Sequence, residues 1–264
     1  MRIMVSPTGS RLSKADHPAL PVTVPEIIGA TAECAKAGAN ALHLHVRDRA
    51  GRHSLDAGLY SEAMAELDRV LPGLPVQITT EAGGVYDTTA QLRLLHDLRP
   101  DWVSISLREA ARSPSDAKAM YGFCRDQAIA VQHIVYDATD AGLLRDLQAT
   151  GALREQESVI LVIGRYDQTQ TTDNSDLDRL LQELPPVGSW MVCAFGPMEH
   201  QVLIEAAKRG GDVRVGFENS IQDANGYPWA DNAASVRALM SGLKATSDNG
   251  PKTEHRRTEL CAET

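Results

Sequence analysis

The 264-residue sequence has few cysteines and no long apolar run. Its four cysteines lack Cys-x-x-Cys spacing, which argues against a disulfide framework and against a cysteine-based zinc cluster. No apolar stretch approaches the roughly 20 residues that cross a bilayer. The first residues also run into proline and glycine too early for a signal peptide. We therefore expect a cytoplasmic protein.

The sequence also lacks an excess of positive charge. Lysine and arginine total 26 against 35 aspartate and glutamate residues, and the formal net charge of -9 argues against a general nucleic-acid partner. Apolar residues make up 43% of the chain, which is enough for a full core. No linker interrupts the pattern before position 249, so we predict one catalytic domain over residues 1–249 and a polar tail over residues 250–264.

Short apolar runs alternate with amphipathic stretches along the chain. We expect strands near 3–5, 41–48, 76–80, 102–107, 130–136, 158–163, 190–195 and 213–216, and helices near 23–37, 56–71, 88–98, 115–127, 140–150, 176–184, 198–209 and 232–243. The first helix has clear ends, because Thr23 and Glu26 have capping-box spacing and Gly38 follows the last turn. Eight strand–helix pairs predict the α/β class and a single (β/α)8 TIM barrel, with an open doubly wound sheet as the alternative.

Two histidines, His43 and His45, stand out on the second predicted strand. Side chains two apart on a strand point to the same face, so the two imidazoles lie side by side. Neutral histidine is the commonest protein ligand for zinc, and this pair suits a divalent metal. A hydrogen-bonded pair of surface histidines is the structural alternative.

Polar residues at the ends of the other strands extend this pattern. Active sites of such barrels form at the carboxyl ends of the strands. The eighth strand carries Arg214, and Glu218 and Asn219 come just past it. The first, second and eighth strands are neighbours in a closed barrel, so Glu218 can meet the two histidines as a third ligand of a catalytic zinc. A turn cap at Glu218 and a buried structural ion pair at Arg214 remain alternatives.

Three segments carry a family resemblance. Gly38–Asp48 with Gly51-Arg52 and Ser54-Leu55-Asp56, Gly210–Asn219, and Pro7-Thr8-Gly9 with Pro18 and Leu20-Pro21 resemble signatures of the β-keto acid cleavage enzymes. The similarity runs in order along essentially the whole chain. It implies a zinc-bearing barrel that forms a homo-oligomer, a tetramer or a dimer. It also implies a reaction of a β-keto acid with acetyl-CoA that yields acetoacetate and a new acyl-CoA.

The resemblance also assigns roles by position. His43, His45 and Glu218 match the zinc ligands, and Arg214 matches an active-site arginine near the substrate. Zinc would polarise the keto group of the chelated β-keto acid and stabilise the enolate formed from it. Arg214 would stabilise the developing oxyanion or orient a water molecule.

Three further residues are candidates for binding the substrate. Thr80 and Ser106 fall near positions that hold the substrate carboxylate in the family. Gly83 lies in a Gly-Gly turn after the third strand, and successive backbone N–H groups in such a turn can bind an anion.

Two positions depart from the family pattern. The residue after the zinc glutamate is commonly aspartate, whereas Asn219 here cannot serve as a base. The candidates for the base are then Glu81, Asp48 or a metal-bound water. The family's glutamate two residues after the Thr-Gly turn, which contacts an amino group on the substrate, is Arg11 here. This charge reversal predicts a substrate whose far end is anionic or neutral.

Two other functions fit parts of the pattern. Zinc-dependent barrel hydrolases also use His-x-His, usually on the first strand with further histidine and aspartate ligands, and His133 is a candidate extra ligand here. A catalytically inactive metal-binding barrel would also accommodate Asn219 and Arg11. Dependence of turnover on acetyl-CoA separates these functions from β-keto acid cleavage.

Overall fold

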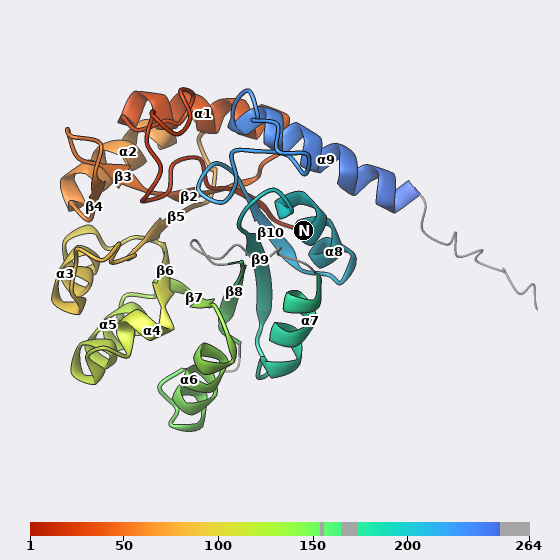
Figure 1. The fold of residues 1–264 in the computed structure, drawn as a ribbon. Coiled ribbons are helices and arrows are strands. Elements are labelled where there is room, and N and C mark those ends of the chain that lie inside the picture. Colours follow the sequence, from red (N-terminus) through yellow and green to blue (C-terminus); the bar gives the residue numbers. More distant parts are fainter. Residues whose placement is uncertain (154–155, 165–173, 249–264) are drawn as a thin grey trace, which may run out of the picture.

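Eight parallel strands close into a barrel in a computed structural model that describes residues 1–153, 156–164 and 174–248. Neighbouring strands follow the order β1-β10-β9-β8-β7-β6-β5-β2 (Figure 1). Their bounds are β1 Ile3–Val5, β2 Ala41–Leu44, β5 Val76–Thr79, β6 Trp102–Ser106, β7 Ala130–Val135, β8 Ser158–Ile163, β9 Ser189–Ala194 and β10 Asp212–Val215. The predicted α/β class and the single TIM barrel are confirmed.

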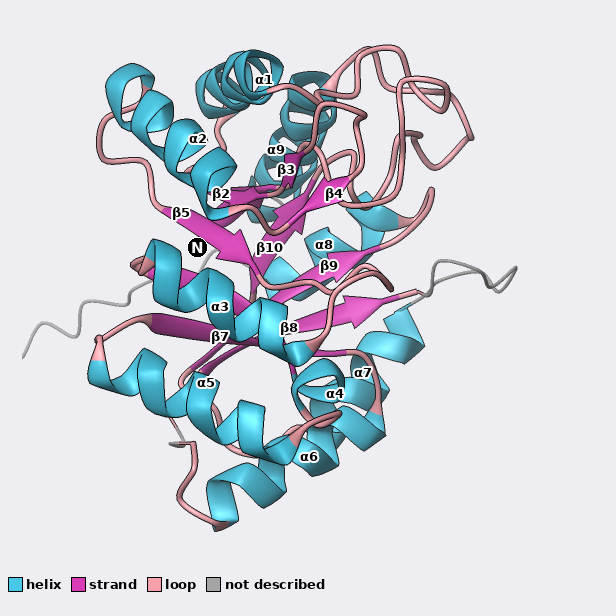
Figure 2. Cartoon of the chain, turned by 90° about the vertical axis from the view of Figure 1, so that its left-hand side faces the viewer, coloured by secondary structure: helices cyan, strands magenta, loops and turns pink. Residues whose placement is uncertain are grey.

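Helices surround the barrel (Figure 2). Their bounds are α1 Val24–Ala37, α2 Ala57–Val70, α3 Thr88–Leu98, α4 Leu107–Ala110, α5 Pro114–Asp126, α6 Ala138–Ala149, α7 Asn174–Glu183, α8 Glu199–Lys208 and α9 Asn232–Asp248. All eight predicted helices are present, and α4 is an additional short turn between β6 and α5. Its buried Leu107 and Ala110 join the core. The predicted tail, residues 250–264, lies outside the described residues.

The ends of α1 follow the capping signals in its sequence. The Thr23 side chain accepts from the Glu26 backbone N–H, and the Glu26 carboxylate accepts from the N–H groups of Val22 and Thr23, both at 3.0 Å. Gly38 ends the helix in the left-handed region at φ 118°, a conformation that glycine adopts without a Cβ penalty. Local chemistry therefore fixes this helix, and it packs beside α9 to close the ring (Figure 1).

Two apolar layers hold the fold together. The larger layer lies between the strands and the surrounding helices and includes Leu42, Leu44 and Ile78. A smaller cluster that includes Met4 and Ile160 fills the barrel interior. Interior side chains pack a TIM barrel as a filled core rather than a pore, so polar groups inside it are exceptions that need a reason.

The second predicted strand is shorter than expected. Sequence patterning predicted one strand over 41–48, whereas β2 ends at Leu44 and His45 lies between β2 and a small hairpin. In that hairpin β3 (Val46–Arg47) pairs antiparallel with β4 (His53–Ser54), and this pairing draws the chain out of the barrel sheet. The buried Arg47 guanidinium stabilises the departure by donating to the Gly9 and Gly51 carbonyls, each at 2.9 Å.

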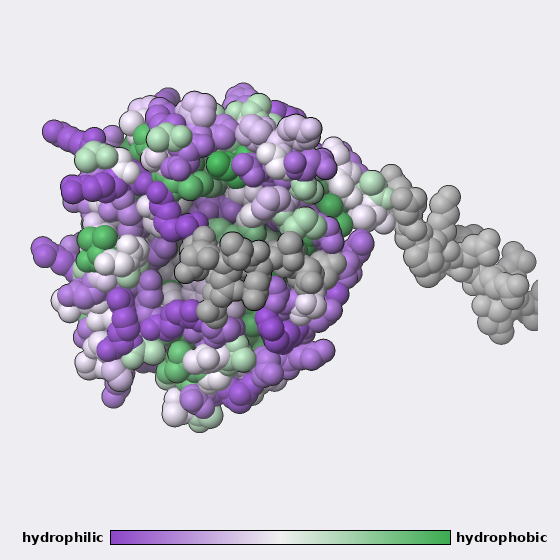
Figure 3. Space-filling model, in the orientation of Figure 1, coloured by the Kyte–Doolittle hydropathy of each residue, from purple (hydrophilic) through white to green (hydrophobic). Residues whose placement is uncertain are grey.

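The surface seen in Figure 3 is mainly hydrophilic, with hydrophobic residues gathered in small patches. Within the described ranges, no helix combines the length and the apolar character that a bilayer-spanning segment needs.

Candidate metal centre and active site

Three buried side chains converge at the carboxyl end of the barrel. His43 lies on β2, His45 follows that strand, and Glu218 lies in the loop after β10. The two Nε2 atoms are 3.1 Å apart, and Glu218 Oε2 lies 3.4 Å from His45 Nε2 and 3.8 Å from His43 Nε2. Among the described residues no other three histidine, cysteine or carboxylate side chains converge in this way. β1 pairs with both β2 and β10, so the predicted neighbourhood of the three strands is confirmed.

A buried amide sets the tautomer of His43. Its Nδ1 lies 2.7 Å from Gln77 Oε1, and Gln77 Nε2 donates to Gln132 Oε1 at 3.0 Å. An amide oxygen only accepts, so Nδ1 carries the proton and the Nε2 lone pair faces the convergence point. Burial, and then the charge of Arg214, hold the pKa of His43 well below its ordinary value. The ring is therefore neutral at pH 7, which is the form that binds a metal.

Glu218 is held in place from two sides. Ser6 Oγ donates to Glu218 Oε2, and the Glu218 backbone N–H donates to the Ser6 carbonyl at 3.1 Å. Arg214 Nη2 donates to Glu218 Oε1 at 3.2 Å. Burial by itself raises the pKa of Glu218, but the charge of Arg214 opposes burial, and this pKa lies well below the usual carboxyl value. The carboxylate is ionised, as a metal ligand must be.

The space at the convergence point suits one ion. A cavity of about 20 Å³ lies there, which is room for an ion or one water molecule. Its lining residues are His43, His45, Thr79, Glu81, Ile134, Tyr136, Val162, Phe195, Arg214 and Glu218. Two imidazole nitrogens and one carboxylate oxygen form the donor set of many catalytic zinc sites, so these residues fit a bound divalent metal.

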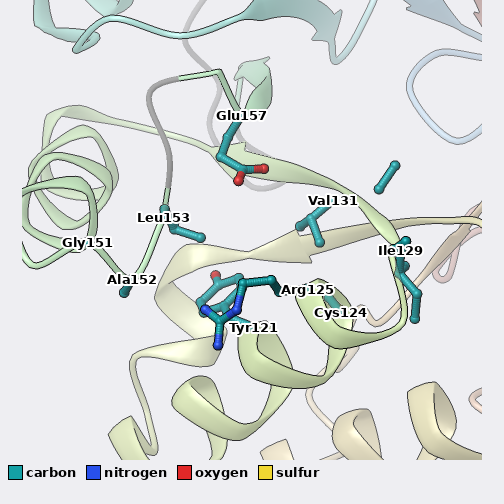
Figure 4. A pocket seen from close by; sticks show the side chains of 11 residues that line it. Tyr121, Cys124, Arg125, Ile129, Val131, Gly151, Ala152, Leu153 and Glu157 are labelled. Carbon is teal, nitrogen blue, oxygen red and sulfur yellow. The ribbon is translucent and has the colours of Figure 1, made fainter.

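A larger cavity lies at the other end of the barrel. It measures about 430 Å³ and lies at the amino ends of β7 and β8, where its wall includes Tyr121, Arg125 and Glu157 (Figure 4). None of the converging metal ligands lines it. Active sites of TIM barrels form at the carboxyl end of the strands, so the chemistry of the side chains, and not the cavity volume, locates this site.

Arg214 and Asn219 form one buried network beside the metal ligands. Arg214 Nη2 donates to Asn219 Oδ1 at 3.4 Å. Asn219 Nδ2 donates to Glu199 Oε1 at 3.2 Å and to the Arg214 carbonyl at 3.0 Å. Arg214 lines the small cavity, whereas Asn219 does not. The structure brings the two residues into contact, with Asn219 behind Arg214.

Glu81 and Asp48, the two side-chain candidates for the base, lie in different places. Glu81 lines the small cavity, and its Oε2 lies 3.8 Å from His45 Nδ1. Asp48 forms a turn in the β3–β4 hairpin, where its carboxylate accepts from the backbone N–H groups of Ala50 at 2.8 Å and Arg52 at 2.9 Å. Of the two carboxylates, only Glu81 faces the site.

The predicted substrate-binding residues do not all face the site. Ser106 ends β6 with a buried hydroxyl that makes no hydrogen bond within the described part of the chain. The Thr80 hydroxyl donates to the Ser104 carbonyl at 3.0 Å, and its neighbour Thr79 lines the small cavity instead. Strand alternation explains why Thr79 and not Thr80 faces the cavity, since adjacent residues of a strand point to opposite faces. Gly83 lies exposed in the loop between β5 and α3 and does not line the cavity.

Arg11 lies over the wall of the site. Its side chain is exposed, and its Cζ lies 5.7 Å from the centroid of the Phe195 ring. Phe195 lines the small cavity. A guanidinium at this distance from an aromatic face is attracted by the ring quadrupole. Arg11 therefore brings a positive charge close to the cavity wall from the loop after β1.

Sequence reasoning missed Gln77, Glu199 and His53. Gln77 had a signal, because an amide inside the apolar run Val-Gln-Ile of a barrel strand must find a polar partner. His53 donates from Nε2 to the Glu81 carbonyl at 2.7 Å, and its ring centroid lies 5.5 Å from that of His45. Neither His53 nor Glu199 belongs to a motif that marks it.

His133, the candidate extra ligand, faces away from the site. Its ring centroid lies 5.5 Å from that of Tyr121 on α5, and its neighbour Gln132 bonds to Gln77 inside the barrel. His133 is therefore buried between β7 and the helical layer, and it does not join the converging ligands.

Comparisons with known proteins find similarity along nearly the whole chain. A family model described as beta-keto acid cleavage enzyme matches residues 1–257. The 3-keto-5-aminohexanoate cleavage enzyme of Fusobacterium nucleatum subsp. nucleatum is 24% identical over 241 residues, which are 88% of this chain and 87% of that protein. The 3-oxoadipate:acetyl-CoA acetyltransferase of Cupriavidus necator is 24% identical over 249 residues, or 90% of this chain and 87% of that protein.

Solved structures share the barrel. ObcA in complex with oxaloacetate superposes with a TM-score of 0.68 at 17% identity, over 87% of this chain and 64% of that one. This chain thus spans just under two thirds of ObcA. A type I 3-dehydroquinate dehydratase from Clostridium difficile superposes with a TM-score of 0.61 at 12% identity, over 94% of this chain and 92% of the other. At these identities the likeness concerns the fold alone.

Proposed function

Because the chain belongs to the β-keto acid cleavage enzyme family, and is therefore an acyltransferase that breaks a carbon–carbon bond, we propose a zinc-dependent reaction of an anionic β-keto acid with acetyl-CoA. A substrate R-CO-CH2-COO⁻ and acetyl-CoA give acetoacetate and R-CO-CoA. A bond from the CH2 carbon to the acetyl carbon forms as the acetyl thioester C–S bond breaks and CoA thiolate leaves. The bond between the R-CO carbon and the CH2 carbon then breaks as the CoA sulfur bonds to the R-CO carbon. The observation that carries the proposal is the convergence of His43, His45 and Glu218.

We assign the metal to these three residues. Zinc held by His43, His45 and Glu218 would supply Lewis-acid polarisation of the substrate keto group, which makes the neighbouring CH2 more acidic. Gln77 keeps the His43 Nε2 lone pair directed inward, and Ser6 and Arg214 hold the Glu218 carboxylate. These contacts prepare the ligands before the substrate arrives.

Glu81 is the proposed base. Its carboxylate lines the cavity beside His45, where it can accept the CH2 proton of the substrate. Asn219 carries no basic atom and is committed to Arg214 and Glu199. Arg214 faces the cavity with a fixed positive charge, and it would stabilise the oxyanion that develops at the thioester carbonyl.

Arg11 and the loops around the cavity would select the substrate. The guanidinium beside Phe195 favours a negative charge at the far end of R, so we propose a keto-dicarboxylate as substrate. The name of the Cupriavidus necator relative, which acts on 3-oxoadipate, supports this class. Ser106 offers a buried hydroxyl for the carboxylate next to the CH2, with Thr80 and Gly83 as further predicted contacts.

One experiment tests the proposed activity directly. A panel of β-keto acids is incubated with acetyl-CoA and the zinc-loaded protein, and acyl-CoA products are read out by mass. The proposal expects a new acyl-CoA and acetoacetate in equal amounts, with a keto-dicarboxylate turned over fastest. Consumption of substrate without acetyl-CoA would identify a barrel hydrolase instead. Zinc binding without any turnover would identify a catalytically inactive metal-binding barrel.

We further propose that the enzyme is cytoplasmic, that residues 1–249 form one catalytic domain, and that the chain forms a homo-oligomer. The three described cysteines, Cys34, Cys124 and Cys193, are free and buried, which is usual in a reducing compartment. Size-exclusion chromatography with light scattering should give the mass of a dimer or a tetramer. A monomer of 28.6 kDa would contradict the predicted assembly.

A further inference from the structure

A carboxylate that the proposed reaction does not use lies behind Arg214. Glu199 begins α8 and is 1% exposed. Its Oε1 accepts from the Gly216 backbone N–H at 3.1 Å and from Asn219 Nδ2 at 3.2 Å. Glu199 does not line the small cavity beside the metal ligands. A buried carboxylate is costly to maintain, and a purely structural position would usually be filled by an apolar side chain.

The hydrogen bonds of Glu199 determine which way the Asn219 side-chain amide is oriented. Oε1 of Glu199 acts as an acceptor toward the Gly216 N–H, so it requires the NH2 group of Asn219 on its side, as does the Arg214 carbonyl at 3.0 Å. The amide oxygen of Asn219 must then face the other way, where it accepts from Arg214 Nη2 at 3.4 Å. An inverted amide would place its NH2 group against the guanidinium, with two donors facing each other.

The orientation of Asn219 matters for the direction of the Arg214 guanidinium. Nη2 of Arg214 donates to Asn219 Oδ1 and also to Glu218 Oε1 at 3.2 Å. These two contacts, with a third from Nη2 to Cys193 Sγ at 3.3 Å, fix the plane of the Arg214 guanidinium, which lines the cavity. Burial raises the pKa of Glu199 well above its ordinary value, and Oε1 can accept in the neutral and in the ionised form alike.

We propose that Glu199 is a positioning residue for this reaction, acting through Asn219 on Arg214. Asn219 accepts from Arg214 and donates to Glu199, so it transmits the orientation set by Glu199 to Arg214. This inference rests on the proposed function. It predicts that the effects of substitutions at positions 199 and 219 on kcat are not additive. It also predicts that a glutamine at position 199 can compensate for an aspartate at position 219.

Four variants test this coupling. Glu199→Gln keeps an acceptor oxygen and should retain kcat within about threefold. Glu199→Ala removes the acceptor and should lower kcat at least tenfold, with a smaller change in KM and with zinc content unchanged. Asn219→Asp replaces the NH2 group that donates to Glu199 Oε1 and to the Arg214 carbonyl with an acceptor oxygen, and should also lower kcat. The double variant Glu199→Gln/Asn219→Asp should recover at least tenfold over Asn219→Asp, because the amide introduced at position 199 can donate to the new carboxylate.

A control on the same helix separates this effect from a general weakening of α8. Glu205 is paired with Arg209, and Glu205→Ala truncates a glutamate of the same helix without touching the network. Its kcat should equal that of the unmodified enzyme. Unchanged kcat in Glu199→Ala, or equal activity of Asn219→Asp and the double variant, would overturn the inference.

A crystal structure of Glu199→Ala gives a readout that needs no turnover. The inference requires that the Asn219 amide inverts or that Arg214 Nη2 leaves Glu218 Oε1. A structure in which both contacts persist overturns it, whatever the activity. An unmodified protein that turns over no β-keto acid would contradict the proposed function alone, and the positions of Asn219 and Arg214 in the variant would still decide the inference.

Discussion

Gln77 Oε1 accepts a hydrogen bond from His43 Nδ1 at 2.7 Å, and this bond decides which nitrogen of the imidazole faces the metal site. The same amide is held by Gln132 at 3.0 Å. A glutamine that is fully buried inside the barrel is thereby explained by the orientation it gives to a ligand.

Replacing Gln77 with leucine should weaken zinc binding. The substitution removes the acceptor of the Nδ1 proton, so the ring is free to rotate and to change tautomer. Loss of such a partner costs roughly 10- to 100-fold in metal affinity. Competition with a chelator measures the effect. Gln132→Leu removes the anchor of Gln77 but leaves its acceptor oxygen, and should cost less. Equal zinc affinity in both variants and the unmodified protein would contradict the assignment.

Replacing His45 with alanine should leave the protein without stoichiometric zinc, because one of two imidazole ligands is gone. Metal analysis after dialysis measures the content. His96→Ala is the control, since His96 is exposed on α3 and packs against Phe123 with a centroid distance of 4.0 Å. The proposed ligand set is wrong if His45→Ala retains one zinc per chain.

Replacing Gly9 with alanine should disturb the metal site. Gly9 has φ +60°, and a Cβ there would lie 2.7 Å from Glu218 Cγ. Gly51 has φ +75° with open space around it, so Gly51→Ala carries the backbone strain alone. Each variant should lose about 1 kcal/mol of unfolding free energy from the left-handed backbone. Only Gly9→Ala should also lose zinc affinity, as titration would show. An equal loss of zinc affinity in Gly51→Ala would show that backbone strain, and not the contact with Glu218, weakens zinc binding.

Replacing Arg11 with glutamate should reverse the preference for the far end of the substrate. The negative charge beside Phe195 would repel a keto-dicarboxylate and attract an amino-keto acid. The value of kcat/KM for the dicarboxylate should fall at least tenfold while that for the amino substrate rises. Arg93→Glu, an exposed substitution on α3, should change neither value. Faster use of the amino substrate by the unmodified enzyme would also refute the proposed charge preference.

The capping box of α1 should make stability depend on pH. Burial alone raises the pKa of Glu26, but Lys14 and the backbone N–H groups of Val22 and Thr23 outweigh it and lower this pKa to about 2. A depressed carboxyl pKa stabilises the folded state above the unfolded value of 4.5, and the stabilisation is lost as pH falls toward 2. Glu26→Gln should therefore be less stable than the unmodified protein at pH 7.

Urea unfolding at several pH values measures this difference. The gap between Glu26→Gln and the unmodified protein should narrow between pH 4.5 and about 2, where the carboxyl group becomes protonated in both states. Glu33→Gln provides a control on the same helix, because Glu33 pairs with Lys36 at the surface. A gap of constant size across this range would show that the hydrogen bonds, and not the charge, carry the contribution of Glu26.

The sequence by itself determined the elements whose causes are local. The Thr23–Glu26 box and Gly38 fix α1 because their hydrogen bonds span only a few residues. Apolar periodicity fixed the eight strand–helix pairs, and their number implied closure of the barrel. Closure in turn placed β1 between β10 and β2, so the meeting of Glu218 with the two histidines followed from strand order.

Only the tertiary structure decided the contacts that join distant segments. The antiparallel β3–β4 pairing ended β2 at Leu44, against the single strand expected from patterning. Strand geometry turned Thr79 instead of Thr80 toward the site. The partners Gln77 of His43 and Glu199 of Asn219 lie 34 and 20 positions away in the chain. No local pattern marks such pairs, because their hydrogen bonds exist only once the barrel has brought separate strands together.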